Sequence, residues 1–135
     1  MSLETAVAGR NAMLDALEVE IGPDAVLKIR TGAPPGIGNA DSGTVLVPIQ
    51  LPTNYMAAAA AGSKAKSGTW EGTATAAGTA GHFRLYASDG TTQYQEGTVS
   101  AAGSGGKLVL LVNGVPGDSI AIGDVVAIDV FFWDV

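Results

Sequence analysis

The side chains that could perform chemistry are few, and none has partners at a spacing typical of an active site. His82 is the single histidine, and it alternates with Arg84 and Tyr86 along one segment. A nucleophilic triad needs a serine in a sharp turn, but the sequence has no Gly-x-Ser-x-Gly motif. We therefore predict a structural histidine, no catalytic residue and a protein that is not an enzyme.

Acidic residues recur near the C-terminus without forming a metal-binding motif. Asp118, Asp124, Asp129 and Asp134 are spread along the chain, whereas a calcium loop gathers its oxygens as Asp-x-Asp-x-Asp-Gly. The chain has no cysteine, which excludes thiolate zinc sites and disulfides. We predict no metal site.

Two glycine-rich segments lack what a nucleotide site requires. Residues 103–107 read Gly-Ser-Gly-Gly-Lys, but the first glycine of a phosphate loop is absent, and Leu108 replaces the magnesium-binding Ser or Thr. Residues 36–38, Gly-Ile-Gly, lack the third glycine and the flanking strand and helix of a dinucleotide fingerprint. Both segments are predicted to be turns, and no cofactor is expected.

Three aromatic residues could form a platform for sugar stacking if all of them faced solvent. These are Trp70, Tyr86 and Tyr94. Trp70 is expected in the core instead, which leaves only a pair of tyrosines.

Composition indicates one β-rich domain over residues 1–135. A chain of this length buries one core, and its 19 glycines favour sheets joined by many turns. The net charge of -6 argues against nucleic acid, because phosphate binding needs clustered Lys and Arg; Lys64 and Lys66 are expected to be solvated loop residues. No apolar run is long enough to span a bilayer and no signal peptide is recognised, so we expect a soluble chain without a membrane partner.

The N-terminal segment is predicted to be an amphipathic helix over residues 1–22, followed by a β-sandwich over residues 25–135. Ser2 can cap the helix, and Gly22-Pro23 is typical of its end. Apolar residues recur at spacings of three, four and seven: Leu3, Val7, Leu14, Leu17 and Ile21.

Alternating patterns predict strands at residues 25–30 and 44–51, joined by an irregular loop at residues 31–41. Pro48 lacks a backbone donor, which favours an edge position or an interrupted ladder. Residues 56–61 suit either a helical turn or a packed extended segment. The remaining pattern predicts an antiparallel, jelly-roll-like β-sandwich with strands near residues 68–75, 81–87, 92–99, 107–112 and 124–133.

The hairpin turn at residues 89–90 leaves two registers open. A two-residue loop pairs Leu85 with Tyr94, whereas a three-residue loop pairs Arg84 with Glu96. A bulge is expected in the second strand near Glu96. In either register the core face of the first strand holds Phe83, Leu85 and Ala87.

The last predicted strand, at residues 124–133, is apolar on both faces and therefore needs cover on both sides. The cover behind it is either the N-terminal helix or a neighbouring subunit. The candidate subunit interface holds Phe131, Trp133, Leu14 and Leu17. The predicted core holds Trp70, Phe83, Leu85, Val126, Ile128 and Val130.

Five segments carry a resemblance to known proteins: Thr5–Val7, Arg10–Ala16, Leu27–Gly32, Lys64–Glu71 and Gly81–Arg84. With them the chain resembles a family of small structural proteins encoded among the head and tail genes of tailed bacteriophages and prophages. The match covers most of the chain and weakens after residue 100.

The resemblance implies a non-enzymatic virion protein, most specifically a capsid decoration or cement protein that binds the outside of the head and stabilises it. It implies the major capsid protein as partner, a homo-oligomer with a trimer favoured, and a place on the capsid surface after synthesis in the host bacterial cytoplasm. The alternatives are a neck or tail component of the virion, a carbohydrate-binding β-sandwich module and a hydrolase. The family motifs mark no active site, so no functional residue is carried over.

Overall fold

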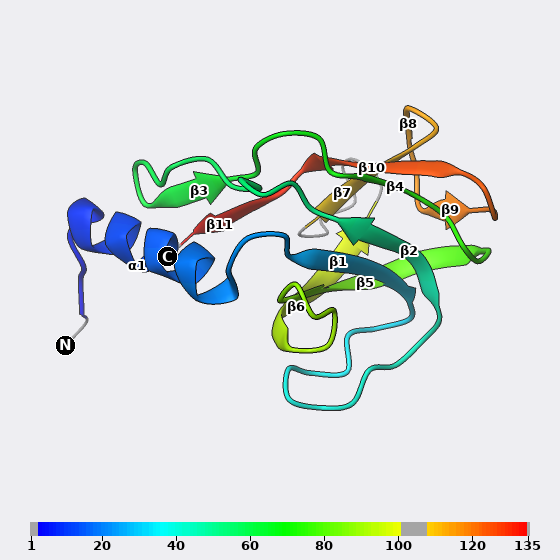
Figure 1. Ribbon diagram of the computed structural model, residues 1–135, viewed down its shortest axis with the longest axis horizontal. Coiled ribbons are helices and arrows are strands. Elements are labelled where there is room, and N and C mark those ends of the chain that lie inside the picture. Colours follow the sequence, from blue (N-terminus) through cyan, green and yellow to red (C-terminus); the bar gives the residue numbers. More distant parts are fainter. Residues whose placement is uncertain (1–2, 101–107, 135) are drawn as a thin grey trace.

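The computed structural model describes residues 3–100 and 108–134, and it shows a mainly β protein with one N-terminal helix (Figure 1). The helix is α1 (Val7–Ile21). The strands are β1 (Val26–Thr31), β2 (Val45–Gln50), β3 (Ser63–Ala65), β4 (Glu71–Thr73), β5 (Gly78–Tyr86), β6 (Gln93–Ser100), β7 (Leu108–Val112), β8 (Val115–Pro116), β9 (Ser119–Ile120), β10 (Val125–Val130) and β11 (Phe132–Asp134). The predicted fold class is confirmed.

The strands form a large sheet and a small one. The large sheet has the order β2-β1-β5-β6-β7-β10-β4, with β8 and β9 attached to β7 and β5, and β11 pairs with β3 in the small sheet. The pairings between these strands are antiparallel except that of β6 with β7, which makes the large sheet mixed rather than purely antiparallel.

The ends of the large sheet approach each other, so that it nearly closes as a barrel. The amide of Thr75, just after β4, donates to the carbonyl of Leu46 in β2 at 2.8 Å. A Cβ at Gly72 would lie 2.8 Å from the carbonyl oxygen of Pro48, so only glycine fits at this approach. β2 ends the strand path, as the proline predicted.

We call the large sheet the body, and α1 with β3 and β11 the arm. In Figure 1 the arm projects to one side of the body, and α1 lies beside the small sheet. The predicted start of the helix is wrong, because α1 begins only at Val7 and has no side-chain cap. The proposed cap, Ser2, lies outside the described residues. Gly22 ends the helix with a φ of +84°, as the sequence predicted.

The segment at residues 56–61 is extended rather than helical. Met56 and Ala60 form isolated bridges with Lys66 and Ser63, which add a further edge to the small sheet. The sequence pattern predicts a strand at residues 68–75, but only the central part, β4, forms one. The short strands β3, β8 and β9 were not predicted.

The hairpin of β5 and β6 adopts the register that pairs Arg84 with Glu96. The irregularity lies between Leu85 and Tyr86, so that Tyr86 pairs with Gln93. Tyr94 is the extra residue, so the bulge lies in β6 as expected but two residues before Glu96.

The C-terminal strand is interrupted, and the interruption exchanges its two faces. The pairing of β10 with β7 shifts between Ile128 and Val130, and Phe131 belongs to neither β10 nor β11. Val130 and Phe132 consequently face outward, at 45% and 37% exposure, whereas Phe131 and Trp133 are buried. The prediction of Val130 as a core residue is wrong. The other predicted core residues are all buried: Trp70, Phe83, Leu85, Val126 and Ile128.

Candidate interaction surface

The face of β5 opposite the apolar core is polar, and it is also fully buried. His82, Arg84 and Tyr86 are each 0% exposed. The loop between β1 and β2 covers them, and a Cβ on Gly81 would overlap the backbone of Gly32 in that loop. Close approach of the loop therefore depends on a glycine in β5.

Arg84 joins this loop to the sheet through its whole guanidinium group. Its Nε donates to Glu96 Oε2 at 3.1 Å, one terminal nitrogen donates to Asp41 Oδ1 at 2.7 Å and the Asn39 carbonyl at 3.0 Å, and the other donates to the Gly36 carbonyl at 2.8 Å. The planar fork of arginine can satisfy several acceptors at fixed angles. We call Arg84 and these acceptors the clasp.

Asp41 extends the clasp to two neighbouring side chains. It accepts a hydrogen bond from the Tyr86 hydroxyl at 2.7 Å and forms an ion pair with Arg30 at 3.1 Å. Partial burial acts to raise the pKa of Asp41, but hydrogen bonds from Tyr86 and Arg84 outweigh it and lower the pKa below its ordinary value. The contacts of Arg30, Asp41 and Arg84 therefore hold the loop between β1 and β2 against the sheet.

His82, the first candidate for chemistry, has a structural contact. Its Nδ1 lies 2.9 Å from the Gly32 carbonyl, which can only accept, so Nδ1 carries the proton. Its Nε2 is buried without a partner among the described residues. Over residues 3–100 and 108–134, no group of three His, Asp or Glu side chains is placed to hold a metal ion.

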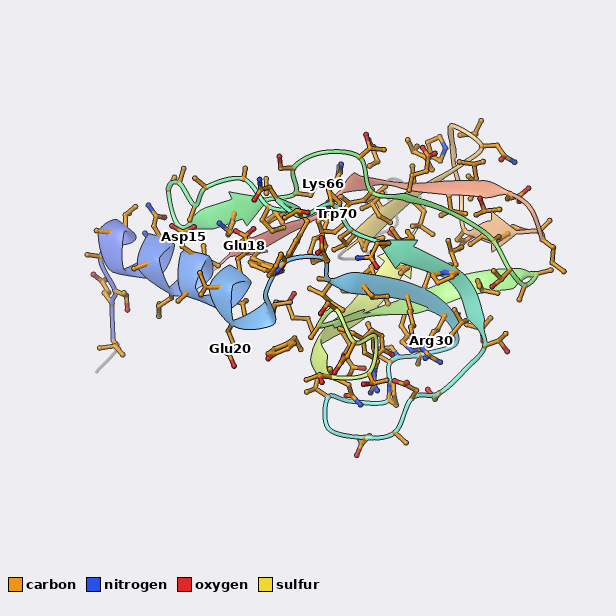
Figure 2. The ribbon with its side chains drawn as sticks, in the orientation of Figure 1. Asp15, Glu18, Glu20, Arg30, Lys66 and Trp70 are labelled. Carbon is orange, nitrogen blue, oxygen red and sulfur yellow. The ribbon has the colours of Figure 1, made fainter. Side chains whose placement is uncertain are left out.

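Lys64 is buried rather than solvated, which corrects the prediction from sequence. Its Nζ lies 2.6 Å from Asp15 and 2.9 Å from Glu18, both on α1. Figure 2 shows these two carboxylates on the side of α1 that faces β3, whereas Glu20 points away. Burial acts to lower the pKa of Lys64, but its hydrogen bonds to both carboxylates raise the pKa overall. The ion pairs thus dock α1 on β3 within the arm.

The aromatic platform considered from the sequence does not form, and Trp70 lies in the core as expected. Trp70 is buried, and its indole nitrogen donates to the carbonyls of Tyr55 and Ser67, both at 3.2 Å. Tyr86 is also buried, and Tyr94 is half-buried. The three rings therefore do not present a common face to solvent for a sugar.

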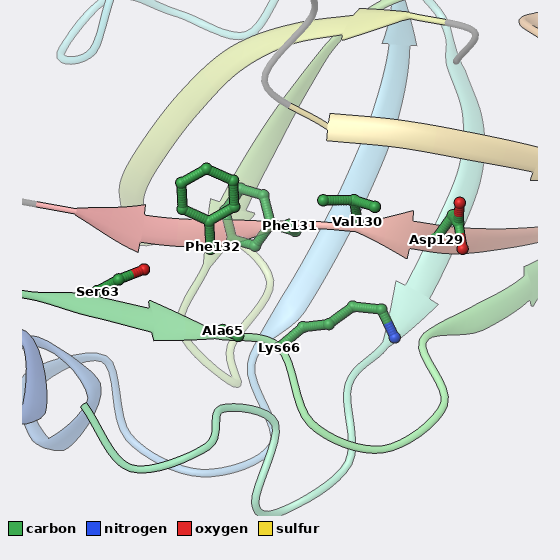
Figure 3. A pocket seen from close by; sticks show the side chains of 7 residues that line it. All are labelled: Ser63, Ala65, Lys66, Asp129, Val130, Phe131 and Phe132. Carbon is green, nitrogen blue, oxygen red and sulfur yellow. The ribbon is translucent and has the colours of Figure 1, made fainter. Parts of the chain in front are cut away.

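A groove of about 510 Å³ lies where β10 meets β11 (Figure 3). Val130 and Phe132 are its exposed apolar residues. Lys66 extends toward the end of the groove at which Asp129 lies, so one positive and one negative group are displayed together. The full lining is Ser63, Ala65, Lys66, Asp129, Val130, Phe131 and Phe132.

The residues predicted as a subunit interface lie mostly inside the chain. Phe131 packs on Trp70 and Phe83, with ring centroids 5.5 and 5.4 Å apart, and Trp133 is 4% exposed. Leu14 is buried and Leu17 is partly buried against the core. An exposed interface at this place would instead use the neighbouring side chains of the groove. Asp129 is a charged residue within an otherwise apolar strand, and it is the feature of the sequence that indicates the interruption between β10 and β11.

Comparison with protein-family models, with curated proteins and with solved structures found no match for the chain. Among the described residues, no helix is long and apolar enough to cross a membrane.

Proposed function

We propose that this protein is a non-enzymatic structural protein of a tailed-phage virion, a decoration or cement protein that binds the major capsid protein on the outside of the head. The resemblance in five segments of the sequence supports the virion role. The observation in the structure that favours a binding role over catalysis is the groove, because it pairs exposed apolar side chains with charges of both signs.

We further propose that the groove is the contact between copies of the chain. A surface that displays Lys66 and Asp129 together has charges complementary to those of a second copy of itself. Exposed Phe132 and Val130 supply the apolar area, and aromatic side chains contribute strongly to small interfaces. The resulting homo-oligomer, a trimer by the resemblance, would present repeated weak contacts to a symmetric capsid.

The test is the place of the protein in purified particles. Particles of the phage or prophage that encodes the chain are labelled with gold-conjugated antibodies, and heads are heated with and without the gene. We expect gold on the head surface and release of DNA at a lower temperature from heads that lack the protein. Absence of the protein from purified particles would overturn the proposal.

A neck or tail component is the second candidate, and the same labelling distinguishes it. Gold confined to the junction of head and tail, or to the tail, would replace the head assignment. A carbohydrate-binding module is disfavoured by the burial of Trp70 and Tyr86. Binding of the purified protein to a glycan array would restore that interpretation.

A further inference from the structure

The sequence contains one Asn-Gly pair, Asn113-Gly114, and it forms the turn between β7 and β8. Val112 pairs with Val115 across the turn, and φ is +50° at Asn113 and +81° at Gly114. Such values are typical of the two-residue turn that Asn-Gly favours in β-hairpins. Both turn residues are exposed, so water reaches the side chain of Asn113.

Asn-Gly is also the pair in which an asparagine side chain reacts most readily with the backbone. The nitrogen of Gly114 attacks Cγ of Asn113 and closes a succinimide ring, while the bond from Cγ to Nδ2 breaks and ammonia leaves with the amide proton. Water then opens the ring to aspartate or isoaspartate. Glycine favours the attack because it has no Cβ in the way. The pairing of β7 with β8 leaves the Gly114 amide outside its register.

The start of β10 restrains the side chain of Asn113 from this reaction. Its Oδ1 accepts a hydrogen bond from the Val125 amide at 2.9 Å, and its Nδ2 donates to Asp124 Oδ1 at 3.1 Å. The backbone amide of Asn113 also donates to the Val125 carbonyl at 2.8 Å. Ring closure turns Cγ onto the next backbone nitrogen and expels Nδ2. The side-chain bonds to β10 must therefore break first.

Deamidation changes what faces Asp124. Hydrogen bonds from the amide of Ala121 and from Asn113 lower the pKa of Asp124, so this carboxyl group is ionised at neutral pH. In the product an oxygen replaces Nδ2, and a second carboxylate meets Asp124 where a donor stood. Like charges at contact repel each other. Isoaspartate in addition lengthens the backbone of the turn.

We propose that Asn113 is a site of spontaneous deamidation, which proceeds only when the turn has opened from β10 and which prevents the turn from closing again. Local opening of this part of the sheet is then recorded as a permanent negative charge. The other asparagines, each followed by a residue with a Cβ, react more slowly: Asn11, Asn39 and Asn54. The proposal is independent of the virion role, because neither turn residue belongs to the groove.

The first experiment measures the rate of the reaction. The protein is incubated in water enriched in heavy oxygen, either folded or unfolded in guanidinium chloride, and the peptide that contains Asn113 is followed by mass spectrometry. We expect faster deamidation in the unfolded chain, with heavy oxygen in the new carboxylate. Equal rates in the folded and unfolded chains, or no reaction at Asn113 in either, would overturn the proposal.

Two variants test whether Asp124 restrains the side chain. Asp124→Ala removes one hydrogen bond, so deamidation of the folded protein should be about tenfold faster, with no change in the unfolded chain. Asp124→Asn keeps an acceptor for Nδ2 and should react at the rate of the parent. Circular dichroism confirms that each variant is folded. A folded Asp124→Ala protein that reacts no faster than the parent would contradict the restraint by β10.

The product is tested separately, which also covers the case in which Asp124→Ala does not fold. Asn113→Asp should speed hydrogen exchange of the Val125 amide about tenfold, because one hydrogen bond is lost and two carboxylates meet. Adding Asp124→Asn restores a donor and an acceptor in exchanged positions, so exchange should slow again. Asn54→Asp adds the same charge on an exposed loop and should leave this amide unchanged. Exchange at Val125 unaffected by Asn113→Asp, or not slowed by the second change, would overturn the proposal.

Discussion

Among the described residues the body buries Arg30 and Arg84 and the arm buries Lys64, and Arg84 and Lys64 are held in different ways. In the body, Arg84 lies in a strand flanked by β1 and β6, and its partners include two backbone carbonyls of the covering loop. In the arm, Lys64 lies in a three-residue strand, and its partners are Asp15 and Glu18 of one helix. Arginine provides a planar fork, whereas lysine provides a compact charge.

This difference predicts that loss of the cation has different consequences for stability in the body and in the arm. Loss of Arg84 removes a donor from two loop carbonyls and from the carboxylates of Asp41 and Glu96, while Asp41 keeps its contacts with Tyr86 and Arg30. Loss of Lys64 frees two carboxylates at the outer side of the arm, and the side chain of Asp15 is already 51% exposed. The clasp should therefore act on global stability, and the lysine mainly on the docking of α1.

Of the two cation variants, Arg84→Met is expected to have the larger effect. Removing one partner of a buried ion network costs about 3–5 kcal/mol of unfolding free energy, and here Glu96, whose side chain is only 11% exposed, loses its cation. Urea unfolding followed by circular dichroism measures the change. Arg84→Lys restores the charge without the fork and should recover only part of the loss; full recovery would show that charge alone matters.

Lys64→Met should have a smaller effect, confined to the arm. We expect a loss of about 1–2 kcal/mol, since the freed carboxylates can hydrate and Leu14 and Ile21 still pack on the core. Hydrogen exchange should accelerate at the amides of α1 and remain slow in β5. Equal acceleration in both elements would remove the distinction between the regions.

Acid should weaken both regions. Asp41 and Asp15 have pKa values below the ordinary value, Asp41 through Tyr86 and Arg84 against its own burial, and Asp15 through Lys64. A carboxyl group with a lowered pKa in the folded state stabilises above its unfolded pKa, about 3.9, and the stabilisation is lost as the pH falls through the folded value.

The melting temperature of the parent protein should therefore fall below about pH 4. The fall should be shallower in Arg84→Met, because Asp41 then loses one of the hydrogen bonds that lower its pKa. An identical pH profile for the parent and the variant would contradict the role of the clasp in acid sensitivity.

Much of the fold could be predicted from local patterns. The alternation in β1 and β2 and the Gly22 stop are short-range signals, and the structure confirms them. The turn left two registers open for the hairpin of β5 and β6, and the structure pairs Arg84 with Glu96. The predicted start of the helix was wrong because the apolar spacing extends to Leu3, whose side chain is in fact 94% exposed. Local spacing cannot show which residues find a packing partner.

The site was harder to predict because it depends on contacts between distant segments. The alternation in β5 correctly separates the face of Phe83 from that of Arg84, but a polar face is normally read as solvated. Its burial depends on residues about 45 positions away, as in the contact of Arg84 with Asn39. The burial of Lys64 likewise depends on a helix 49 residues earlier.

The smallest effect on stability is expected for Phe132→Ser, and comparison with Phe131→Ser separates the exposed groove from the core beneath it. Phe132 is 37% exposed in the groove, whereas its neighbour Phe131 is 3% exposed against Trp70 and Phe83. Phe132→Ser should cost about 1 kcal/mol, while Phe131→Ser should cost about 3–5 kcal/mol.

Oligomeric state gives the opposite order for the two variants. If copies associate through the groove, Phe132→Ser should give folded monomers in light scattering, because it removes the aromatic contact without disturbing the core. Phe131→Ser should instead lose its fold, as circular dichroism would show. A folded Phe132→Ser protein with an unchanged oligomer would place the contact between copies elsewhere, because the groove would then be dispensable for association.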